Sequence, residues 1–388
     1  MGAVVGEGYV IVFYNDVFPC PRGAPCKDEG QNDDRESHPR RILAQKGLDA
    51  KLVCQCLPLF LAPLLSALIA CFAMTLNLFF AMQPHGDRWV KYDHYPREFI
   101  RRLIRGKPKV FGLERTFLNL CAGLDKIGVQ YRVNDYKYIK KHPEELACII
   151  GTPYLLNREW KNPVIFGPAG HSHPSDAPDL FSRFDIQKVL VYGPWMKEMC
   201  EPFWNGKVAM WPVGIDTDLW SPADSPKEYD FIVYDKIMWD YERQKAEFLT
   251  PILSELERCG LKTAYLRYGS YDESAYLELL RRSKAMLFLC EHETQGIAYQ
   301  QALSCNVPVL AWEQGMWLDP KYYPRIKHHA SSVPYWDERC GVKFKDLSEF
   351  EAALNLFLDQ RDTFLPRRFV TENLTLGERA KSYLSFCL

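Results

Sequence analysis

The chain has 388 residues, which is more than one ordinary domain needs and enough for two domains of about 100–200 residues each. Hydrophobic residues make up 47% and charged residues 25%, as in average soluble globular proteins. The formal net charge of −1 argues against binding nucleic acid by bulk electrostatic attraction, since that needs a concentrated basic surface. We therefore expect no nucleic-acid partner.

The thirteen cysteines are scattered singly along the chain. The close pair Cys54 and Cys56 has no matching second pair, so the pattern does not indicate a zinc site or a disulfide framework. Cys148 and Cys290 lie inside apolar runs, where a free thiol behaves as a small hydrophobe. This cysteine usage favours a reducing compartment, and we expect the protein to be cytoplasmic.

The stretch from Leu52 to Pro84 contains no charged residue and is long enough to span a bilayer. It also admits a division, because residues 76–82 have the pattern of a short buried strand that a Rossmann-like domain needs first. On that interpretation the functional protein begins near Met74. We expect residues 1–73 to be an extension outside the catalytic fold, with an apolar membrane anchor at 52–73 as the alternative.

Short apolar strands alternate with helical segments from residue 74 onward. Several strands end in glycine or proline, as at Gly151 and Gly167, which is typical of a parallel sheet with crossover helices. We expect a first Rossmann-like domain at residues 74–207. Ligands of such sheets bind beyond the carboxyl ends of the strands. The loops that matter are then 83–89, 167–176 and 193–195. The expected elements are strand 76–82, helix 113–127 and strands 129–133, 147–150, 163–166 and 188–192.

A second alternating unit follows a connector at residues 208–222 that contains proline and glycine. We expect a second Rossmann-like domain at residues 208–372 and one terminal helix at 373–388. The elements expected in the second domain are strand 229–234, helix 242–258, strand 263–268, helix 273–283, strand 285–290, helix 297–305 and strand 307–311.

The stretch from Cys290 to Val309 is the most informative of the sequence, because it combines a strand, an acidic loop and a helix. Gly296 lets the backbone approach a ligand closely, and the helix start offers unpaired N–H groups that suit a diphosphate. Glu293 accepts hydrogen bonds and can take them from sugar hydroxyls, while Gln301 can offer a donor and an acceptor to a ribose. An ordinary βαβ unit with a solvated acidic loop explains the same residues equally well.

The same stretch resembles the signature of the retaining GT-B glycosyltransferases of family four, in which Glu-x-Phe-Gly opens a motif of two glutamates with seven residues between them. Glu293 matches the first glutamate, Gly296 matches the glycine, and Ala302 and residues 308–309 fall in step. Gln301 stands at the second glutamate position, where the family residue holds the nucleotide ribose. Glutamine keeps the hydrogen bonding and loses the charge.

The resemblance covers about residues 75–388 and includes residues 269–285 before the motif and the interdomain linker at 212–222. It implies a GT-B fold, with two Rossmann-like domains whose parallel sheets face a central cleft. The N-terminal domain then lies on the acceptor side, and the C-terminal domain binds the nucleotide-sugar. The resemblance implies that Glu293 positions the sugar as a catalytic residue. The donor-binding residues that it implies in the motif are Thr294, Gln295, Gly296, Ile297 and Gln301.

Members of this family hold the donor phosphates with an Arg and a Lys that follow the first strand of the C-terminal domain. The family spacing is not met here. Lys236 at the strand end and Arg243 at the helix start are the predicted phosphate ligands, because both can reach a phosphate from these positions. Lys245 is a third basic residue nearby, and a solvated charge on a helix face is the alternative for at least one of the three.

The loop at residues 167–176 contains two histidines, His171 and His173, with an H-x-H spacing. No third ligand is evident, so we expect no metal site. The resemblance implies that this loop faces the cleft, where a family histidine often contacts the donor sugar. His173 is the predicted catalytic contact, with His171 as the alternative.

These patterns predict a hexosyltransferase-type glycosyltransferase that moves a sugar from a nucleotide-diphosphate sugar to a growing glycan or glycolipid. Retention follows from the resemblance, and we expect neither a metal nor another cofactor. Polysaccharide or glycolipid assembly at the cytoplasmic face of a membrane, with peripheral membrane contact, is the setting expected by analogy of fold. A non-catalytic sugar-nucleotide or glycan-binding protein on a decayed transferase scaffold is the alternative. An enzyme of the same fold that epimerises or hydrolyses a nucleotide-sugar is a further one.

Overall fold

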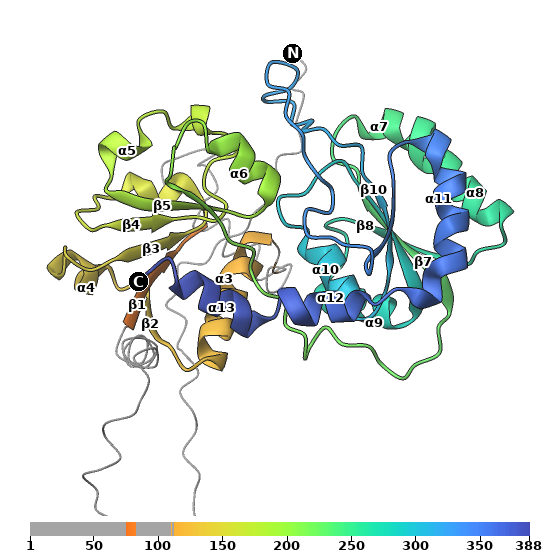
Figure 1. Cartoon of the computed structure of the whole chain (residues 1–388), viewed down its shortest axis with the longest axis horizontal. Helices are drawn as coiled ribbons and strands as arrows, with labels where there is room; N and C mark the ends of the chain where they lie inside the picture. The colour runs from red at the N-terminus through yellow and green to blue at the C-terminus, as the bar shows by residue number, and fades with distance from the viewer. Residues whose placement is uncertain (1–74, 83–109, 111) are drawn as a thin grey trace, which may run out of the picture. The chain divides into compact units, whose positions relative to one another are not determined.

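The computed structural model describes residues 75–82, 110 and 112–388 (Figure 1). The expected extension 1–73, with its apolar stretch 52–73, and the expected loop 83–89 lie outside the described residues. Within the described ranges, none of the helices combines the length and apolar character needed to cross a bilayer. The cysteines in these ranges are free thiols.

The first domain is built on a six-stranded parallel sheet with the strand order β2-β1-β3-β4-β5-β6. Its central strands β3 and β4 are buried along their whole length, which explains why they are continuously apolar. The strand order reverses at β1 and β3. The strands are β1 (Thr75–Phe80), β2 (Gln130–Val133), β3 (Ala147–Ile150), β4 (Val164–Phe166), β5 (Ile186–Val191) and β6 (Val208–Met210). The helices are α3 (Gly112–Lys126), α4 (Tyr136–Lys141), η1 (Pro153–Asn157), η2 (Pro174–Asp176), α5 (Leu180–Arg183) and α6 (Pro194–Cys200).

Alternate residues of these strands enter two different cores. Phe79 belongs to the core that α5 and α6 cover, whereas its neighbour Leu78 is buried on the opposite face. Helix α13 (Leu376–Leu384) packs beside α3 there (Figure 1). A Cβ at Gly123 of α3 would lie 2.6 Å from the Leu376 carbonyl oxygen, so the two helices need glycine at this crossing. The last helix of the chain is therefore part of the first domain.

The second domain is built on a five-stranded parallel sheet with the order β11-β10-β9-β7-β8. The strands are β7 (Tyr229–Lys236), β8 (Thr263–Arg267), β9 (Ser283–Cys290), β10 (Val309–Trp312) and β11 (Gly341–Phe344). The helices are α7 (Tyr241–Gln244), the π-helical turn η3 (Lys245–Leu249), α8 (Thr250–Arg258), α9 (Glu273–Arg281), α10 (Ile297–Ser304), α11 (Leu347–Gln360), η4 (Arg361–Thr363) and α12 (Pro366–Asn373).

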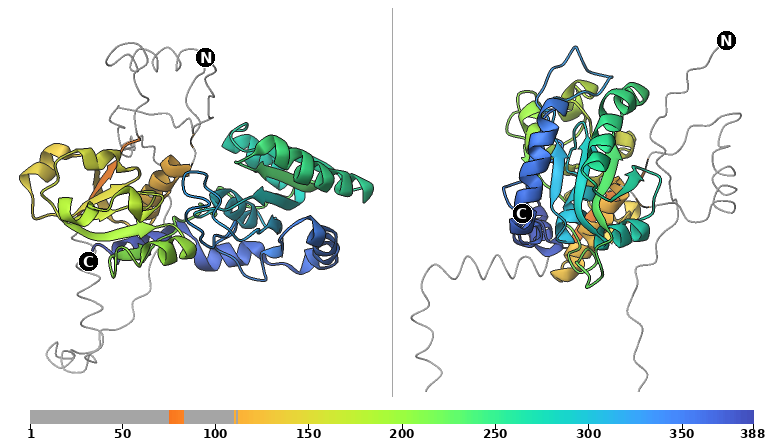
Figure 2. Two further views of the ribbon diagram at one scale, coloured as in Figure 1. Left: turned by 90° about the horizontal axis from the view of Figure 1, so that it is seen from above. Right: turned by 90° about the vertical axis from the view of Figure 1, so that its right-hand side faces the viewer.

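Helices cover both faces of this second sheet. Leu287 of β9 packs in the core with α8 and α11, and the adjacent Phe288 packs in the core with α9, α10 and α12. Figure 1 shows the two groups of helices on opposite sides of the strands, and Figure 2 gives two further views of the arrangement. The prediction of two Rossmann-like domains with parallel sheets, as in a GT-B fold, is confirmed.

Several elements differ from the predicted ones. Residues 208–210, which we expected to open the second domain, pair with β5 as the edge strand of the first sheet. A three-residue strand directly before a tryptophan and a proline has too little pattern to be distinguished from a connector. The terminal helix predicted at 373–388 is α13, and helix α12 before it was not predicted. Strand β11 and helix α11 were not predicted.

Candidate functional site

A cavity of about 250 Å³ is lined by residues of both domains. On the side of the second sheet it lies at the carboxyl ends of β7 and β9, which are adjacent strands. The strand order reverses at this pair, and open α/β sheets bind their ligands at such a point. The first domain lines the cavity with Val110, Gly112, Leu113, Arg115, Thr116, Ala169 and Tyr192, and the second with Tyr234, Lys236, Tyr268, Tyr271, Glu273, Tyr276, Glu293, Thr294, Gln295, Gly296, Ile297, Ala298 and Gln301.

Lys236 and Glu293 form an ion pair in this cavity, with 2.5 Å between Nζ and Oε1. Their side chains are 17% and 11% exposed. Burial by itself lowers the pKa of Lys236. The neighbouring groups, first among them the Glu293 carboxylate, together raise this pKa by more than burial lowers it, and the result is a pKa well above the ordinary value. Lys236 is therefore a permanent cation at neutral pH. It also lies over the ring of Tyr268, 4.5 Å from the centroid.

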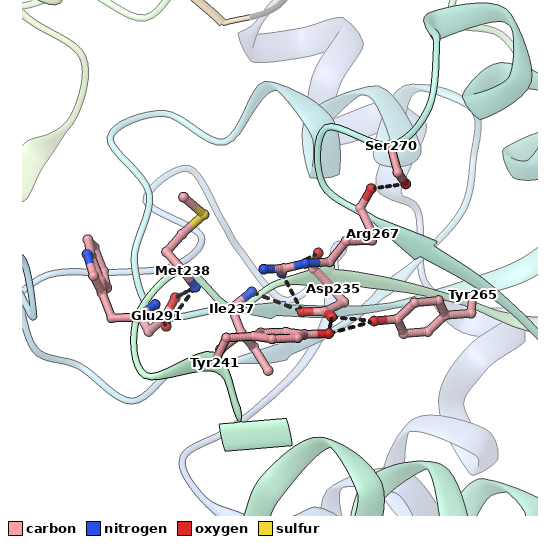
Figure 3. Close-up of polar contacts among 9 residues, drawn as sticks. Asp235, Ile237, Met238, Tyr241, Tyr265, Arg267, Ser270 and Glu291 are labelled. Atoms are coloured by element: carbon pink, nitrogen blue, oxygen red, sulfur yellow. Dashed lines mark hydrogen bonds and ion pairs between the residues drawn. The ribbon is translucent and has the colours of Figure 1, made fainter. Parts of the chain in front are cut away.

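The loop that follows Lys236 is held by two buried carboxylates (Figure 3). Asp235 is fully buried, and one of its oxygens accepts from the Ile237 N–H at 3.0 Å and from the Arg267 guanidinium at 2.9 Å. Its other oxygen accepts from the hydroxyls of Tyr241 and Tyr265. A buried carboxylate with this many donors is fully satisfied, so it fixes the strand end that presents Lys236.

Glu291 is the second of these carboxylates and is 2% exposed. It accepts hydrogen bonds from the backbone N–H groups of Met238 and Trp239, at 2.9–3.1 Å (Figure 3). Burial raises the pKa of Glu291, and these backbone hydrogen bonds oppose the rise. The loops after β7 and β9 are therefore tied to each other beside the Lys236–Glu293 pair.

The backbone of Glu293 is clamped from two sides. Its N–H donates to the Ser331 carbonyl at 2.9 Å, and its carbonyl accepts from the Trp195 indole N–H at 2.8 Å. A Cβ at Gly193 would lie 2.6 Å from the Thr294 carbonyl oxygen, so the turn before α6 needs glycine at this approach. The Glu293 carboxylate projects from a fixed backbone and contacts Lys236.

Helix α10 begins at the cavity. Gly296 is its N-cap residue with φ +83°, a left-handed conformation that favours glycine, and a Cβ there would collide with the Tyr299 ring. The first N–H groups of a helix have no partner within the helix and carry the positive end of its dipole. Gln301, one turn further on, is 5% exposed and lines the cavity, and its side-chain amide makes no hydrogen bond to the described residues. Both features are available to a ligand.

Tyrosine rings form another wall of the cavity. The hydroxyls of Tyr234 and Tyr271 are 2.5 Å apart, and the Tyr276 hydroxyl donates to the Ala298 carbonyl at 2.7 Å. Burial raises the pKa of Tyr234 and Tyr276 well above the ordinary value, so both hydroxyls stay protonated. Together with Tyr268 they give the cavity apolar faces beside its charged groups.

The first domain contributes Arg115, Thr116 and Tyr192 from the other side. The hydroxyls of Thr116 and Tyr192 are 2.9 Å apart, and burial raises the pKa of Tyr192 to about 12. Arg115 forms an ion pair with Glu273 at the start of α9. The two domains thus meet at the cavity through paired side chains.

The structure brings most of the predicted site residues together. Lys236, Glu293, Gly296 and Gln301 line the cavity, as do the neighbouring Thr294, Gln295 and Ile297. The amide of Gln295 has a structural role, because it exchanges two hydrogen bonds with the backbone of Val213 in the linker, at 2.8 and 2.9 Å. Its contribution to a ligand site comes from its backbone.

Arg243 and His173 are not brought to the cavity. Arg243 lies on α7, where its half-exposed guanidinium pairs with Asp240 and Glu247. His173 caps η2 by accepting from the Ser175 N–H at 3.1 Å and is 4% exposed. Neither residue lines the cavity.

The rings around His173 explain its position. Phe203, Trp317 and Tyr322 surround the imidazole with ring centroids 5.3–6.0 Å away. Burial lowers the pKa of His173 and of the neighbouring His171. Ala169 is the residue of the loop at 167–176 that lines the cavity.

The sequence interpretation missed Arg115, Glu273 and the tyrosine wall. Arg115 lies in the first turn of a helix that follows the β1 connection, and such turns face the ligand edge of a parallel sheet. That signal could have identified it. Glu273 carries the same signal, because it lies in the first turn of α9, the helix that follows β8.

No protein-family model matches the chain, and no curated protein sequence matches it. Among solved structures it is similar to sucrose-phosphate synthase from Thermosynechococcus elongatus, with 11% identity and a TM-score of 0.47 over 80% of this chain and 98% of that one. It is also similar to the apo form of the lipopolysaccharide outer core galactosyltransferase WaaB, with 10% identity and a TM-score of 0.45 over 81% and 99% of the two chains. Anabaena HepE in complex with UDP gives 11% identity and a TM-score of 0.44 over 80% and 99%.

Proposed function

We propose that this protein is a glycosyltransferase that transfers a sugar from a nucleotide-diphosphate sugar, bound in this cavity, to a glycan or glycolipid acceptor. The observation that carries the proposal is the Lys236–Glu293 pair beside the start of α10. A permanent cation and unpaired helix N–H groups suit a diphosphate, and a fixed carboxylate suits sugar hydroxyls. The three features meet in one cavity at the strand-order reversal.

Each group has a role in this proposal. Lys236 and the α10 start bind the diphosphate and neutralise the charge that develops on it as the leaving group. The Glu293 carboxylate leaves Lys236, accepts hydrogen bonds from the sugar hydroxyls and so orients the sugar. The side-chain amide of Gln301 binds the ribose. Thr294, Gln295 and Ile297 line the donor with backbone and side-chain surface. Holding donor and acceptor together supplies the rest of the rate enhancement.

The finer features rest on the family resemblance of the motif at 290–309. They are a hexose donor, retention of anomeric configuration, and transfer without a metal ion or another cofactor. Assembly of a polysaccharide or glycolipid at the cytoplasmic face of a membrane is the proposed setting.

The test is ligand-induced thermal stabilisation of the full-length protein against UDP, GDP, ADP and their sugars. A ligand at 100 times its dissociation constant stabilises the folded state by about 2.7 kcal/mol, which is readily measured. Release of the nucleoside diphosphate is then followed with and without glycan acceptors. We expect one nucleotide family to bind and release to require an acceptor.

Other outcomes would contradict the proposal. Binding without turnover for any acceptor would favour a non-catalytic sugar-nucleotide-binding protein. Turnover that needs no acceptor would favour a hydrolase or epimerase. If Glu293→Gln transfers sugar as fast as the unchanged protein, the role given to Glu293 is wrong.

A further inference from the structure

We propose that Arg115 of the first domain is the second cation of the diphosphate site and takes the place of a second basic residue after β7. The inference rests on the proposed function and deepens it. It assigns a phosphate ligand that lies more than one hundred residues from the motif and lines the same cavity from the first domain.

The second domain supplies only one cation to the cavity among the residues that the structure describes there, and that cation is Lys236. Arg243 pairs with two carboxylates on its own helical segment, Asp240 and Glu247, and its side chain is 54% exposed. A diphosphate carries more charge than one lysine neutralises. The site therefore has room for a second cation from another element.

Arg115 lines the same cavity as Lys236 and belongs to the first turn of the 15-residue helix α3. Its side chain is 20% exposed. One terminal nitrogen pairs with Glu273, while the buried Nε–H finds no hydrogen-bond partner among the described residues. A buried donor without a partner is uncommon and costly, so it points to a group that the cavity is built to receive.

The guanidinium fork suits this group, because it binds phosphate oxygens through two parallel N–H donors. The start of α3 adds the positive end of a helix dipole on the same side. Glu273 holds the position that the phosphate would take. Burial raises the pKa of this carboxyl, and Arg115 opposes the rise, so Glu273 is a desolvated partner that an incoming dianion can replace.

The exchange has a structural consequence. Arg115 and Lys236 come from different domains, and each is paired with a carboxylate, Glu273 and Glu293, in the structure. A diphosphate that takes both cations releases both carboxylates and bridges the domains. Glu293 then becomes free for the sugar, so donor binding and the preparation of the sugar site are one event.

The experiment measures dissociation constants of the full-length protein for UDP, GDP and ADP, and for the matching nucleosides without phosphate. We expect Arg115→Gln to weaken binding of the preferred nucleoside diphosphate by about tenfold or more and to change nucleoside binding less than about twofold. Arg115→Lys, which keeps the charge and loses the fork, should be intermediate. Glu273→Gln should strengthen diphosphate binding severalfold, because it frees Arg115 from its competitor.

Arg258→Gln is the matched control, since Arg258 forms exposed ion pairs with Glu255 and Glu351 at the end of α8. Arg243→Gln tests the competing phosphate ligand. The inference is overturned if Arg115→Gln binds the diphosphate normally, if it loses nucleoside binding equally, or if Arg243→Gln alone loses diphosphate binding. It is also overturned if Glu273→Gln weakens binding as much as Arg115→Gln. If the unchanged protein binds no nucleoside diphosphate, the donor proposal itself fails, which is a separate result.

Discussion

The predicted catalytic residues Glu293 and His173 lie in two loops that follow parallel strands, and their surroundings differ. The loop after β9 presents Glu293 to a cavity, where the carboxylate contacts Lys236. The loop after β4 buries His173, whose Nδ1 is engaged by both the N–H and the hydroxyl of Ser175. The comparison teaches that position at the ligand edge of a sheet is not enough. A binding residue must also keep hydrogen-bonding capacity that its own surroundings do not use.

The surroundings of the first-domain loop are aromatic and closed. Asp176, three residues after His173, pairs with Lys321 at 2.8 Å and accepts from the Tyr322 hydroxyl at 2.5 Å. Burial by itself raises the pKa of Asp176, but these two hydrogen bonds outweigh it and lower the pKa below the ordinary value. The loop is thus fixed to residues 317–322 of the second domain. Its histidine is a packing residue of this contact.

The largest expected effect is on the rate of sugar transfer, and it differs between a variant at the cavity and a variant in the first-domain loop. Lys236→Met should lower kcat/KM for transfer by about 10²–10³-fold, because it removes the cation that the proposed function places at the leaving diphosphate. His173→Asn should change kcat/KM far less in protein that is folded, since the imidazole is 4% exposed and lies outside the cavity lining. Initial rates with the preferred donor decide the question. Equal losses in the two variants would break the comparison.

The next largest effect is on the free energy of unfolding, and it tests whether the Asp235 carboxylate stabilises the strand end that presents Lys236. Asp235→Asn should lower the free energy of unfolding by about 3 kcal/mol, because it removes the buried negative charge with which the Arg267 guanidinium pairs. Asp240→Asn is the matched control: it breaks an ion pair with Arg243 in which both side chains are more than half exposed. Such exposed pairs contribute about 0–1 kcal/mol. Denaturant unfolding measures both variants. A loss of under 1 kcal/mol for Asp235→Asn would show that the carboxylate does not stabilise the strand end.

The parts of the site that the sequence predicted are local. Lys236 ends a buried strand and Glu293 follows the next one in the sheet, so parallel topology alone brings them to one edge. Gly296 and Gln301 lie within one loop and one helical turn of Glu293. Strands β3 and β9 were predictable because each is a short apolar run that is almost completely buried.

The parts that could not be predicted depend on distant partners. Arg115 meets Glu273 only when the two domains are in place, and His173 is closed off by Trp317 and Tyr322, far along the chain. Arg243 is different, because its competitors were readable. Asp240 and Glu247 stand three residues before and four after it, which is the spacing of ion pairs along a helix.

A smaller effect compares two neighbouring amides of α10. Gln301→Ala should weaken nucleoside diphosphate binding by about tenfold, or about 1.4 kcal/mol, and leave stability nearly unchanged, since its amide makes no hydrogen bond to the described residues. Gln300→Ala should lower the free energy of unfolding and leave nucleoside diphosphate binding nearly unchanged. Its fully buried amide bonds to Gln295, and that contact holds the linker. Titration and denaturant unfolding of both variants test this. If Gln301→Ala destabilises the fold and leaves affinity intact, its amide is a packing group.

The smallest expected effect is a pH dependence from His292, which lies between Glu291 and Glu293 on the same loop. Burial, with the charge of Lys236, lowers the pKa of His292 to about 3, whereas the unfolded chain titrates near the ordinary value of 6.5. Between pH 6.5 and 3, His292 is therefore protonated in the unfolded state and neutral in the folded state. The free energy of unfolding falls as the pH falls from 6.5 toward 3, and from pH 7.5 to 5.5 this residue accounts for about 1 kcal/mol of the loss.

His292→Gln isolates that contribution, because glutamine does not titrate and every other group stays in place. The loss of stability between pH 7.5 and 5.5 should be smaller in His292→Gln than in the unchanged protein by about 1 kcal/mol, measured by denaturant unfolding at both pH values. An equal loss in the two proteins would mean that His292 accepts a proton in the folded state. The positive charge would then stand next to Glu293, and the loop after β9 would hold a second cation close to Lys236. His292, in the loop after β9, would then be a buried histidine that becomes charged, in contrast to His173 in the first-domain loop, whose pKa burial lowers.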